Sequence, residues 1–274
     1  MKTSALRPLW GLRDATDLQS LVTIVATLLV LGLGYCGYVS AWCWPLAPLG
    51  TYLAYLINHN HQHVTVWRRA ASHPLNVMTG LLLTLAMGFP GSAIVPLHHR
   101  NHHHENNRPA DFMHTRLARF RRGWLNLLTY PAYAAWSYRR QRAAAHAAHA
   151  LRDPRWKRRL GYERAVLFIC LLAAFVWSPM AALIWLIIPW ILGQFWVINA
   201  NFLQHHGCDP EDPAGHARCM TGWLNRFIFN GGWHMAHHAR PSLHWRLLPQ
   251  TGLRSHHARN SLLVMIWECA RARS

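Results

Sequence analysis

Acidic residues are scarce in this 274-residue chain, which has ten Asp and Glu against 28 Lys and Arg and a formal net charge of +18. The shortage limits carboxylate chemistry, and the chain has no Glu-x-x-His pair of the kind used by carboxylate-bridged di-iron bundles. If the chain binds two metal ions, imidazole must therefore supply almost all of the ligands. It has 21 histidines, and neutral imidazole is a good ligand for iron, zinc and copper.

Motifs of several other site classes are also missing. The six cysteines form no Cys-x-x-Cys pair, which argues against a disulfide framework and against a thiolate zinc site, so we expect reduced thiols. Glycine-rich phosphate loops and nucleophile elbows are absent. The His-x-Glu order at His103-His104-Glu105 is found in zinc deaminases, but their Pro-Cys-x-x-Cys motif is missing, which excludes that class.

What the chain does have is long apolar runs separated by arginine-rich segments. Mean hydropathy is close to zero although 52% of the residues are hydrophobic, so the apolar residues are concentrated rather than evenly mixed. Strong basicity can indicate a nucleic-acid binder, but here the arginines flank the apolar runs, as expected of cytoplasmic membrane loops. We therefore predict an integral membrane protein that binds no nucleic acid. The first apolar run is too long for a cleavable signal peptide.

Two apolar blocks are each long enough for a pair of membrane spans. Residues 18–57 are predicted to form the first hairpin, with a turn at residues 42–45, where interfacial tryptophans and a proline coincide. Residues 165–202 are predicted to form the second hairpin, with Ser178-Pro179 near its middle. The expected fold is an all-α, multi-pass membrane protein with four spans and with both termini on the cytoplasmic side.

Residues 75–97 form a third apolar run, broken by Gly88-Phe89-Pro90-Gly91. If this run crossed the membrane, the histidines before and after it would lie on opposite faces. We therefore expect it to dip in and return, or to lie along the interface.

The remaining segments are predicted outside the membrane core. Residues 123–138 are expected to form an interfacial amphipathic helix. The basic segment 139–164 is expected in the cytoplasm, facing either solvent or anionic lipid headgroups. Residues 203–274 are expected to form a cytoplasmic cap with a short amphipathic helix near residues 261–270, so that residues 1–274 make one domain.

Nine histidines and one asparagine recur at spacings that place side chains on one face of a helical turn. Each cluster lies next to an apolar run. Together they would offer about five ligands to each of two metal ions, which leaves room for water, O2 or substrate. The predicted metal ligands are His59, His63, His99, His102, His103, Asn201, His205, His234, His237 and His238. No catalytic residue beyond these ligands is predicted.

Neighbouring residues leave alternatives open. His98 and His104 flank the second cluster, and either is an alternative ligand; His206 competes with His205, which we prefer because it lies one helical turn after Asn201. His61 lies on the opposite helical face from His59 and His63, so we expect it not to bind metal. Two polar residues, Asp111 and Asn230, are predicted to hydrogen-bond metal-bound imidazoles, although a plain turn role suits Asn230 equally.

In order and separation these clusters resemble the three histidine boxes of the membrane fatty-acid desaturase and hydroxylase superfamily. The boxes read HxxxH or HxxxxH, HxxHH and HxxHH, and here they fall at residues 59–63, 99–103 and 234–238. Features around the boxes also look like those of the bacterial branch: the arginine in HHRNHH, Asp111, Asn201-x-x-x-His205, Pro241 and Leu248-Pro249. The resemblance covers nearly the whole chain. The first box departs from the pattern because it lacks the acidic residue that often follows its first histidine.

The resemblance implies a non-haem di-iron enzyme of the bacterial inner membrane with its histidine boxes facing the cytoplasm. In that family two iron ions, Fe2+ or Fe3+, activate O2 and take a hydrogen atom from an unactivated C–H bond. Loss of a second hydrogen gives an alkene, and oxygen rebound gives an alcohol. The implied function is desaturation of a fatty acyl lipid, acyl-CoA or acyl-carrier protein. A separate ferredoxin, rubredoxin or cytochrome-type donor would supply the electrons.

Two other functions remain open. Within the same superfamily, the alternative is an enzyme that hydroxylates or oxidises a lipid, alkane or carotenoid to an alcohol or ketone. Outside it, a metal-binding membrane protein without redox chemistry, such as a zinc or copper transporter, is the remote alternative. A transporter would place its polar ligands at mid-bilayer within its spans, whereas these histidines lie at span ends and beyond.

Overall fold

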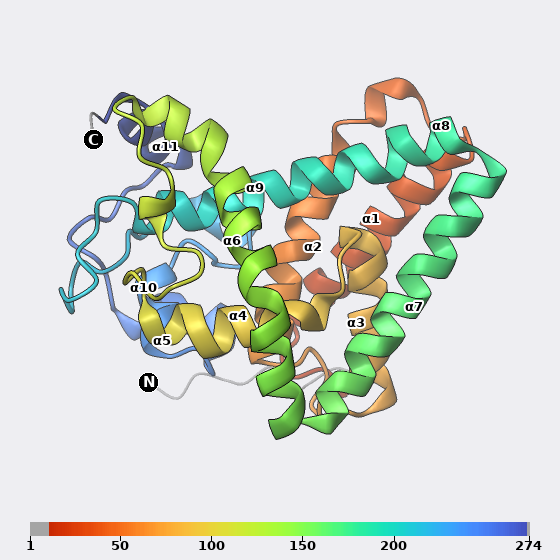
Figure 1. The fold of residues 1–274 in the computed structure, drawn as a ribbon, viewed down its shortest axis with the longest axis horizontal. Coiled ribbons are helices and arrows are strands. Elements are labelled where there is room, and N and C mark those ends of the chain that lie inside the picture. The colour runs from red at the N-terminus through yellow and green to blue at the C-terminus, as the bar shows by residue number, and fades with distance from the viewer. Residues whose placement is uncertain (1–10, 273–274) are drawn as a thin grey trace. The chain divides into compact units, whose positions relative to one another are not determined.

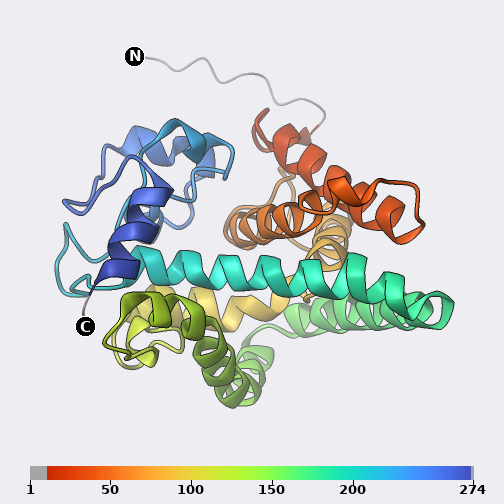
Figure 2. The same ribbon diagram turned by 90° about the horizontal axis from the view of Figure 1, so that it is seen from above.

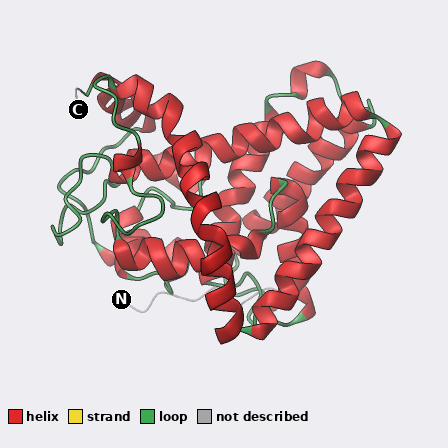
Figure 3. Ribbon diagram, viewed as in Figure 1, coloured by secondary structure: helices red, strands yellow, loops and turns green. Residues whose placement is uncertain are grey.

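Helices make up nearly all of the regular structure in the computed structural model, which describes residues 11–272 (Figure 3). Those residues contain no strand, and only two isolated β-bridges join extended residues. The prediction of an all-α protein is therefore confirmed. The predicted cytoplasmic termini fall largely on residues 1–10 and 273–274, which lie outside the described part. The chain forms two units: unit 1 holds the chain up to Ala93 together with Asp153–Gln194, and unit 2 holds Ile94–Arg152 and the chain from Phe195 onward.

The first apolar block of unit 1 forms a helical hairpin, as predicted for residues 18–57. Its elements are α1 (Asp17–Tyr35), the 3-10 helix η2 (Ala41–Cys43) and α2 (Leu46–His63) (Figure 1). The two long helices pack on each other, and both views show the chain reversing through η2 (Figure 2). Ser40 accepts a hydrogen bond from the Trp42 N–H at the start of η2, and Pro45 directly precedes α2. The tryptophans and the proline thus mark the reversal, as expected.

The third apolar run is broken where its glycines and proline lie. Helix α3 (Pro74–Met87) ends at Gly88, whose φ of +64° is left-handed. A Cβ on Gly88 would lie 2.0 Å from the indole of Trp190, so only glycine fits both the conformation and the space. Beyond the break, the backbone N–H of Gly91 donates to the Thr84 hydroxyl. The predicted break is therefore confirmed, and its depth in a membrane stays a prediction.

The second apolar block also folds back at its predicted centre. Its elements are α7 (Pro154–Trp177), α8 (Pro179–Ala182), the π-helix η6 (Leu183–Ile187) and α9 (Ile188–His205). The helices change direction at Ser178-Pro179. However, α7 begins well before residue 165, because Asp153 accepts hydrogen bonds from the Arg155 and Trp156 N–H groups and Pro154 occupies the first turn. Part of the basic segment predicted at residues 139–164 is therefore the start of this helix.

Three helices within the described residues are long and apolar enough to cross a membrane: Asp17–Tyr35, Pro154–Trp177 and Pro179–His205. A fourth is obtained only if Pro74–Met87 and Gly91–Glu105 are joined across their break as one span. The predicted span within α2 falls below this criterion because its last turns are polar, Asn58 to His63. The predicted total of four spans thus stays a prediction.

Unit 2 contains the second and third histidine boxes. Its helices besides the end of α9 are α4 (Val95–Leu97), the π-helix η4 (His98–His102), α5 (His103–Glu105), η5 (Thr115–Leu117), α6 (Gly123–Arg152), η7 (Trp223–Arg226), α10 (His234–Ala239), η8 (Trp245–Thr251) and α11 (Leu262–Arg271). The amphipathic helix predicted near residues 261–270 is confirmed as α11, capped by the Ser261 hydroxyl. The helix predicted at 123–138 was too short: α6 continues to Arg152 through an alanine-rich stretch with high helix propensity.

Candidate metal centre

The second histidine box is built on a π-helical turn rather than on a plain α-helix. Residues His98–His102 form η4, and the backbone N–H of His103 donates to the carbonyl of His98 five residues earlier. This wider turn brings the side chains of His98 and His103 together, with their ring centroids 4.5 Å apart. The helix ends just after the box because Asn106 and Asn107 adopt left-handed φ values of 46° and 67°. π-turns of this kind are frequent at functional sites.

The third histidine box lies on the short helix α10. The chain enters α10 through Phe229 and Asn230, whose φ values of 54° and 52° are left-handed. The Asn230 side-chain amide donates to the carbonyl of Trp245 at 3.2 Å, and the N–H of Gly232 donates to the Asn225 side chain at 2.8 Å. The contact that Asn230 makes is therefore with the backbone of η8. It fixes the turn that precedes the box.

Four imidazoles of unit 2 come together from three separate segments: η4, the end of α9, and α10. Their potential ligand nitrogens all lie within 4.8 Å of one another. Within this four-histidine centre, Nε2 of His205 lies 2.8 Å from Nε2 of His234, which in turn lies 3.1 Å from Nε2 of His238. The members are His102, His205, His234 and His238. His102, His205 and His234 are buried, so the polar edges of these rings point at one another and away from solvent.

The hydrogen bonds behind these rings show which nitrogens carry protons. Nδ1 of His205 lies 3.2 Å from the backbone carbonyl of His216, and a carbonyl oxygen only accepts. Nδ1 of His102 likewise faces the carboxylate of Asp111 at 2.7 Å. Both protons therefore belong on Nδ1, which leaves a bare lone pair on each Nε2. The Nε2 of His102 is buried and has no hydrogen-bond partner among the described residues. Two buried lone pairs that converge, one of them without any donor, fit a bound cation.

Asp111 is the carboxylate that orients His102. It is buried and also accepts hydrogen bonds from the backbone N–H groups of Asn107 and Met113, at 2.9 and 2.8 Å. Burial by itself would raise the pKa of Asp111, but His102 and the two N–H donors outweigh it and lower the pKa to about 2. The carboxylate is therefore ionised at neutral pH. A carboxylate behind an imidazole fixes the ring and makes its other nitrogen a stronger metal ligand.

The surroundings of His238 disfavour its charged form. Burial lowers the pKa of His238 well below its ordinary value, and the neighbouring imidazoles His234, His102, His205 and His103 lower it further. The charged form of His238 is thus disfavoured at neutral pH. Only the neutral ring has a lone pair to offer, so this environment suits metal binding.

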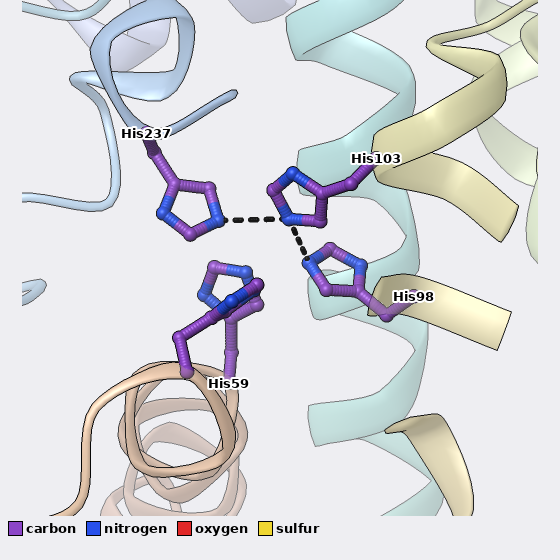
Figure 4. Close-up of side chains that lie close together, drawn as sticks. His59, His98, His103 and His237 are labelled. Atoms are coloured by element: carbon purple, nitrogen blue, oxygen red, sulfur yellow. Dashed lines mark hydrogen bonds between the residues drawn. The ribbon is translucent and has the colours of Figure 1, made fainter. Parts of the chain in front are cut away.

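A second group of imidazoles in unit 2 contains His98, His103 and His237 (Figure 4). Nε2 of His103 lies 2.9 Å from Nε2 of His98 and 3.1 Å from Nε2 of His237, as the dashed lines show. Three ring nitrogens therefore converge here as well. The first histidine box belongs to unit 1, where His59 and His63 stand one turn apart near the end of α2 with ring centroids 5.1 Å apart.

The structure separates His98 from His99, the predicted ligand. His98 is a member of the imidazole group, whereas His99 is not. The His99 ring centroid lies 6.3 Å from that of His103, compared with 4.5 Å for His98. The reason is the π-turn, which shifts the ligand-facing position by one residue relative to an α-helix. Ligation by His99 stays a prediction that rests on the motif.

Asn201 is held by residues that the sequence did not indicate. Its side-chain amide donates to the Tyr130 hydroxyl at 2.7 Å and to the carbonyl of Met113 at 3.2 Å. Tyr130 is fully buried in α6 and packs on Phe202 of α9. These contacts orient the amide one turn before His205. No local pattern marks Tyr130 for this role, because the partners are 71 residues apart in the chain.

The other histidines near the boxes make different contacts. His206 stacks on Phe202, with ring centroids 4.4 Å apart, and is not part of the four-histidine centre. His104 is exposed, and its Nδ1 lies 2.9 Å from the Glu105 carboxylate. His61 is buried in unit 1, where its Nδ1 accepts from the Val66 N–H and its Nε2 lies 3.3 Å from a backbone carbonyl. His61 therefore joins α2 to the following loop.

Comparison with known proteins identifies one relationship. The family model described as fatty acid desaturase matches residues 36–264, which include all three histidine boxes, the second apolar block and residues 36–57 of the first. None of the curated proteins and none of the solved structures gives a significant match.

Proposed function

Because the chain belongs to the fatty acid desaturase family, we propose that it is a membrane-bound, O2-dependent di-iron enzyme that introduces a C=C bond into a fatty acyl chain. The observation that carries the proposal is the four-histidine centre of unit 2, in which the ring nitrogens of three buried imidazoles and one half-buried imidazole converge. The family match supports an oxidoreductase, and the imidazole groups support a metal-dependent one.

The proposed ligands divide between two iron ions. His102, His205, His234 and His238 would hold one ion, with Asn201 positioned by Tyr130 one turn before His205. His103, His237 and one of the adjacent pair His98 and His99 would bind the other. We propose His59 and His63 as further ligands on the strength of their box motif alone. Iron held by these residues would supply O2 activation and removal of hydrogen from an unactivated C–H bond.

The protein's own part in this chemistry is to hold the ligands and their protons. The Asp111 carboxylate and the His216 carbonyl keep protons on Nδ1 of His102 and His205, so that each Nε2 remains a ligand through the reaction. Burial of these rings keeps bulk water away from the reacting oxygen and carbon. Because α9 ends at His205 and belongs to a segment apolar enough to span a membrane, an apolar acyl chain that reaches the centre from the bilayer is the substrate that suits this setting.

The remaining parts of the proposal follow the family. Electrons would come from a separate ferredoxin, rubredoxin or cytochrome-type donor. The acyl group would be carried by a membrane lipid, CoA or acyl-carrier protein. The helices that are long enough to span would lie in a bacterial inner membrane with the histidine boxes on its cytoplasmic side.

The test combines metal analysis of the purified full chain with lipid mass spectrometry of a host that expresses it. We expect two irons per chain and new double bonds in host lipids, and we expect His238→Ala to lose iron and the double bonds. His104→Ala is the matched control, because this exposed histidine directly follows the second box and should leave both unchanged.

Each other outcome has a defined meaning. New hydroxyl or keto groups in place of double bonds would mean that the enzyme hydroxylates or ketolates its substrate, within the same family. One zinc per chain, with no O2 consumption in the presence of a reductant, would overturn the enzyme altogether.

A further inference from the structure

Helix α11 of unit 2 buries apolar side chains on its inner face and also exposes large apolar side chains on its outer face. Met265 and Cys269 are buried in the core of unit 2. On the other side Leu263 is 76% exposed and Trp267 is 56% exposed. Large apolar side chains that gather on an exposed face commonly mark an interaction surface. Among the described residues of unit 2 nothing covers this outer face, so it requires a partner of another kind.

The neighbouring elements of unit 2 expose apolar side chains in the same way. In η7, Trp223 and Phe227 are 76% and 60% exposed. In α6 the outer side chains follow helical spacing, with Trp124, Leu128 and Trp136 exposed. These elements are in contact: the N–H of the first residue of α6, Gly123, donates to a carbonyl at the end of α11, and the turn before η7 pairs with the residues before α11. We call the outer faces of α6, η7 and α11 the aromatic belt.

Both belt helices pack on the last turns of α9, which is one of the three helices able to span a membrane. Leu203 of α9 shares a core cluster with Met265 and Cys269 of α11. Phe202 of α9 shares another with Tyr130 and Ala134 of α6. The inner faces of α6 and α11 are therefore fixed to the end of a candidate span. If α9 crosses a bilayer, its end meets the membrane surface, and the belt lies beside it.

The charges on the belt match a lipid surface. Arg271 lies over the Trp267 ring, 4.4 Å from its centroid, and Arg140 lies over the Trp136 ring at 4.9 Å. On each helix, an exposed tryptophan of the apolar face is therefore covered by a guanidinium group. Glu268, the acidic residue of α11, is tied to Arg259 at 2.8 Å. Tryptophan favours the headgroup level, arginine extends to phosphate, and a basic aromatic surface is attracted to anionic lipid.

From these observations we propose that the aromatic belt is a lipid-binding surface. The outer faces of α6, η7 and α11 insert into the headgroup region of the bilayer, with Trp267 and Trp136 at its level and Arg271 and Arg140 on anionic phosphates. The surface is independent of the metal chemistry. Binding of the aromatic belt to lipid would hold α6, η7 and α11 against the membrane surface.

The experiment uses the full chain in nanodiscs, with a spin label at one belt position at a time. Cys36, Cys43 and Cys170 are first replaced by serine, because the three remaining cysteines are buried. Labels at Leu263→Cys and Phe227→Cys report the belt. Ile169→Cys, exposed near the middle of the apolar part of a candidate span, reports the lipid interior, and Ala214→Cys, on an exposed loop of unit 2, reports water. Accessibility to O2 and to a water-soluble nickel chelate is measured by electron paramagnetic resonance.

We expect the belt labels to fall between the two controls, with nickel accessibility at least about fivefold below that of Ala214→Cys. The labels should lie deeper in discs with anionic lipid than in purely zwitterionic discs. The double variant Arg140→Gln and Arg271→Gln should remove that difference while the labels remain in lipid.

Nickel accessibility equal to that of Ala214→Cys in both lipid compositions would overturn the proposal. If addition of a soluble electron-donor protein then protects the labels, the belt is a docking surface for protein. Broadening of the spectra by spin–spin coupling in discs that hold two chains would instead assign it to a second copy.

Discussion

Two buried polar clusters of this protein contrast in how their hydrogen bonds balance. In unit 1, the carboxylate of Glu163 accepts from the Ser92 hydroxyl at 2.6 Å and from its N–H at 2.8 Å, and the Trp156 indole donates to the Ser92 carbonyl at 2.9 Å. Every polar atom of Ser92 thus has a partner. In unit 2, the lone pairs of His102 and His205 face other imidazoles, and Nε2 of His102 has no hydrogen-bond donor among the described residues.

The difference separates a structural cluster from a binding site. A cluster whose donors and acceptors match is complete by itself and stabilises the fold. In a buried cluster with surplus lone pairs, polar nitrogens lose their contact with water and gain no donor. This costs free energy, which a bound cation offsets. Variants of the serine–carboxylate cluster should therefore lower stability without changing the metal content. Variants of the four-histidine centre should lower the metal content without lowering stability. The following variants test that division.

The largest effect is expected from removing a ring from the four-histidine centre. His205→Ala should lower the iron content from two per chain to one or none and abolish desaturation, because a buried ligand is replaced by an apolar group. Iron per chain after purification and double bonds in host lipids are the two measurements. His206→Ala, one residue later and stacked on Phe202, is the control. Equal iron loss in both variants would mean that the centre is not assembled as described.

The next effect concerns which histidine of the second box faces the metal. The π-turn places His98 rather than His99 with His103 and His237, so His98→Ala should lose one iron per chain and His99→Ala should retain both. Iron stoichiometry and the Mössbauer spectrum of iron-57-loaded protein distinguish one remaining site from two. The opposite ranking would support the motif assignment and show that the box binds metal in α-helical register.

The comparison also shows what the sequence could and could not predict. Apolar runs and their breaks located both hairpins, and the spacing of His234, His237 and His238 placed three rings on one helical turn. Asp111 was a candidate partner for a box histidine, and its carboxylate does bond His102. Such features depend on neighbours that are close in the chain.

The features that escaped prediction depend on the backbone register or on distant packing. Insertion of a π-turn moves the ligand face by one residue, and no residue type between His98 and His102 signals it. The Tyr130 contact that holds Asn201 exists only because α6 packs on α9. The continuation of α6 through residues 139–152 was not predicted, because the prediction for this segment rested on the charge of its arginines. Its alanines have high helix propensity and favour the longer helix.

A smaller loss of metal is expected when the carboxylate behind His102 is neutralised. Asp111→Asn keeps the shape of the side chain but replaces the charged acceptor that holds the Nδ1 proton of His102. Loss of such a partner typically weakens metal affinity about 10- to 100-fold. Competition with a calibrated iron chelator measures it. Glu105→Gln, which changes a carboxylate in contact with the exposed ring of His104 just outside the box, should leave the affinity within about twofold. An unchanged affinity in Asp111→Asn would remove this residue from the site.

Glu163→Ala is expected to have the mildest effect on function. It tests whether the serine–carboxylate cluster of unit 1 has a purely structural role. The variant leaves the N–H and hydroxyl of Ser92 buried without acceptors, and each such group costs about 1–3 kcal/mol. We therefore expect the free energy of unfolding in detergent to fall by about 3 kcal/mol, with iron per folded chain unchanged.

Glu163→Gln, which keeps one acceptor oxygen, should recover about half of the loss. Tyr162→Ala, the exposed neighbour on α7, should stay within about 0.5 kcal/mol of the native chain. If Glu163→Ala instead lost iron at unchanged stability, the cluster in unit 1 would act on the metal site through Ser92 and the five residues between it and His98. The division between the two clusters would then fail.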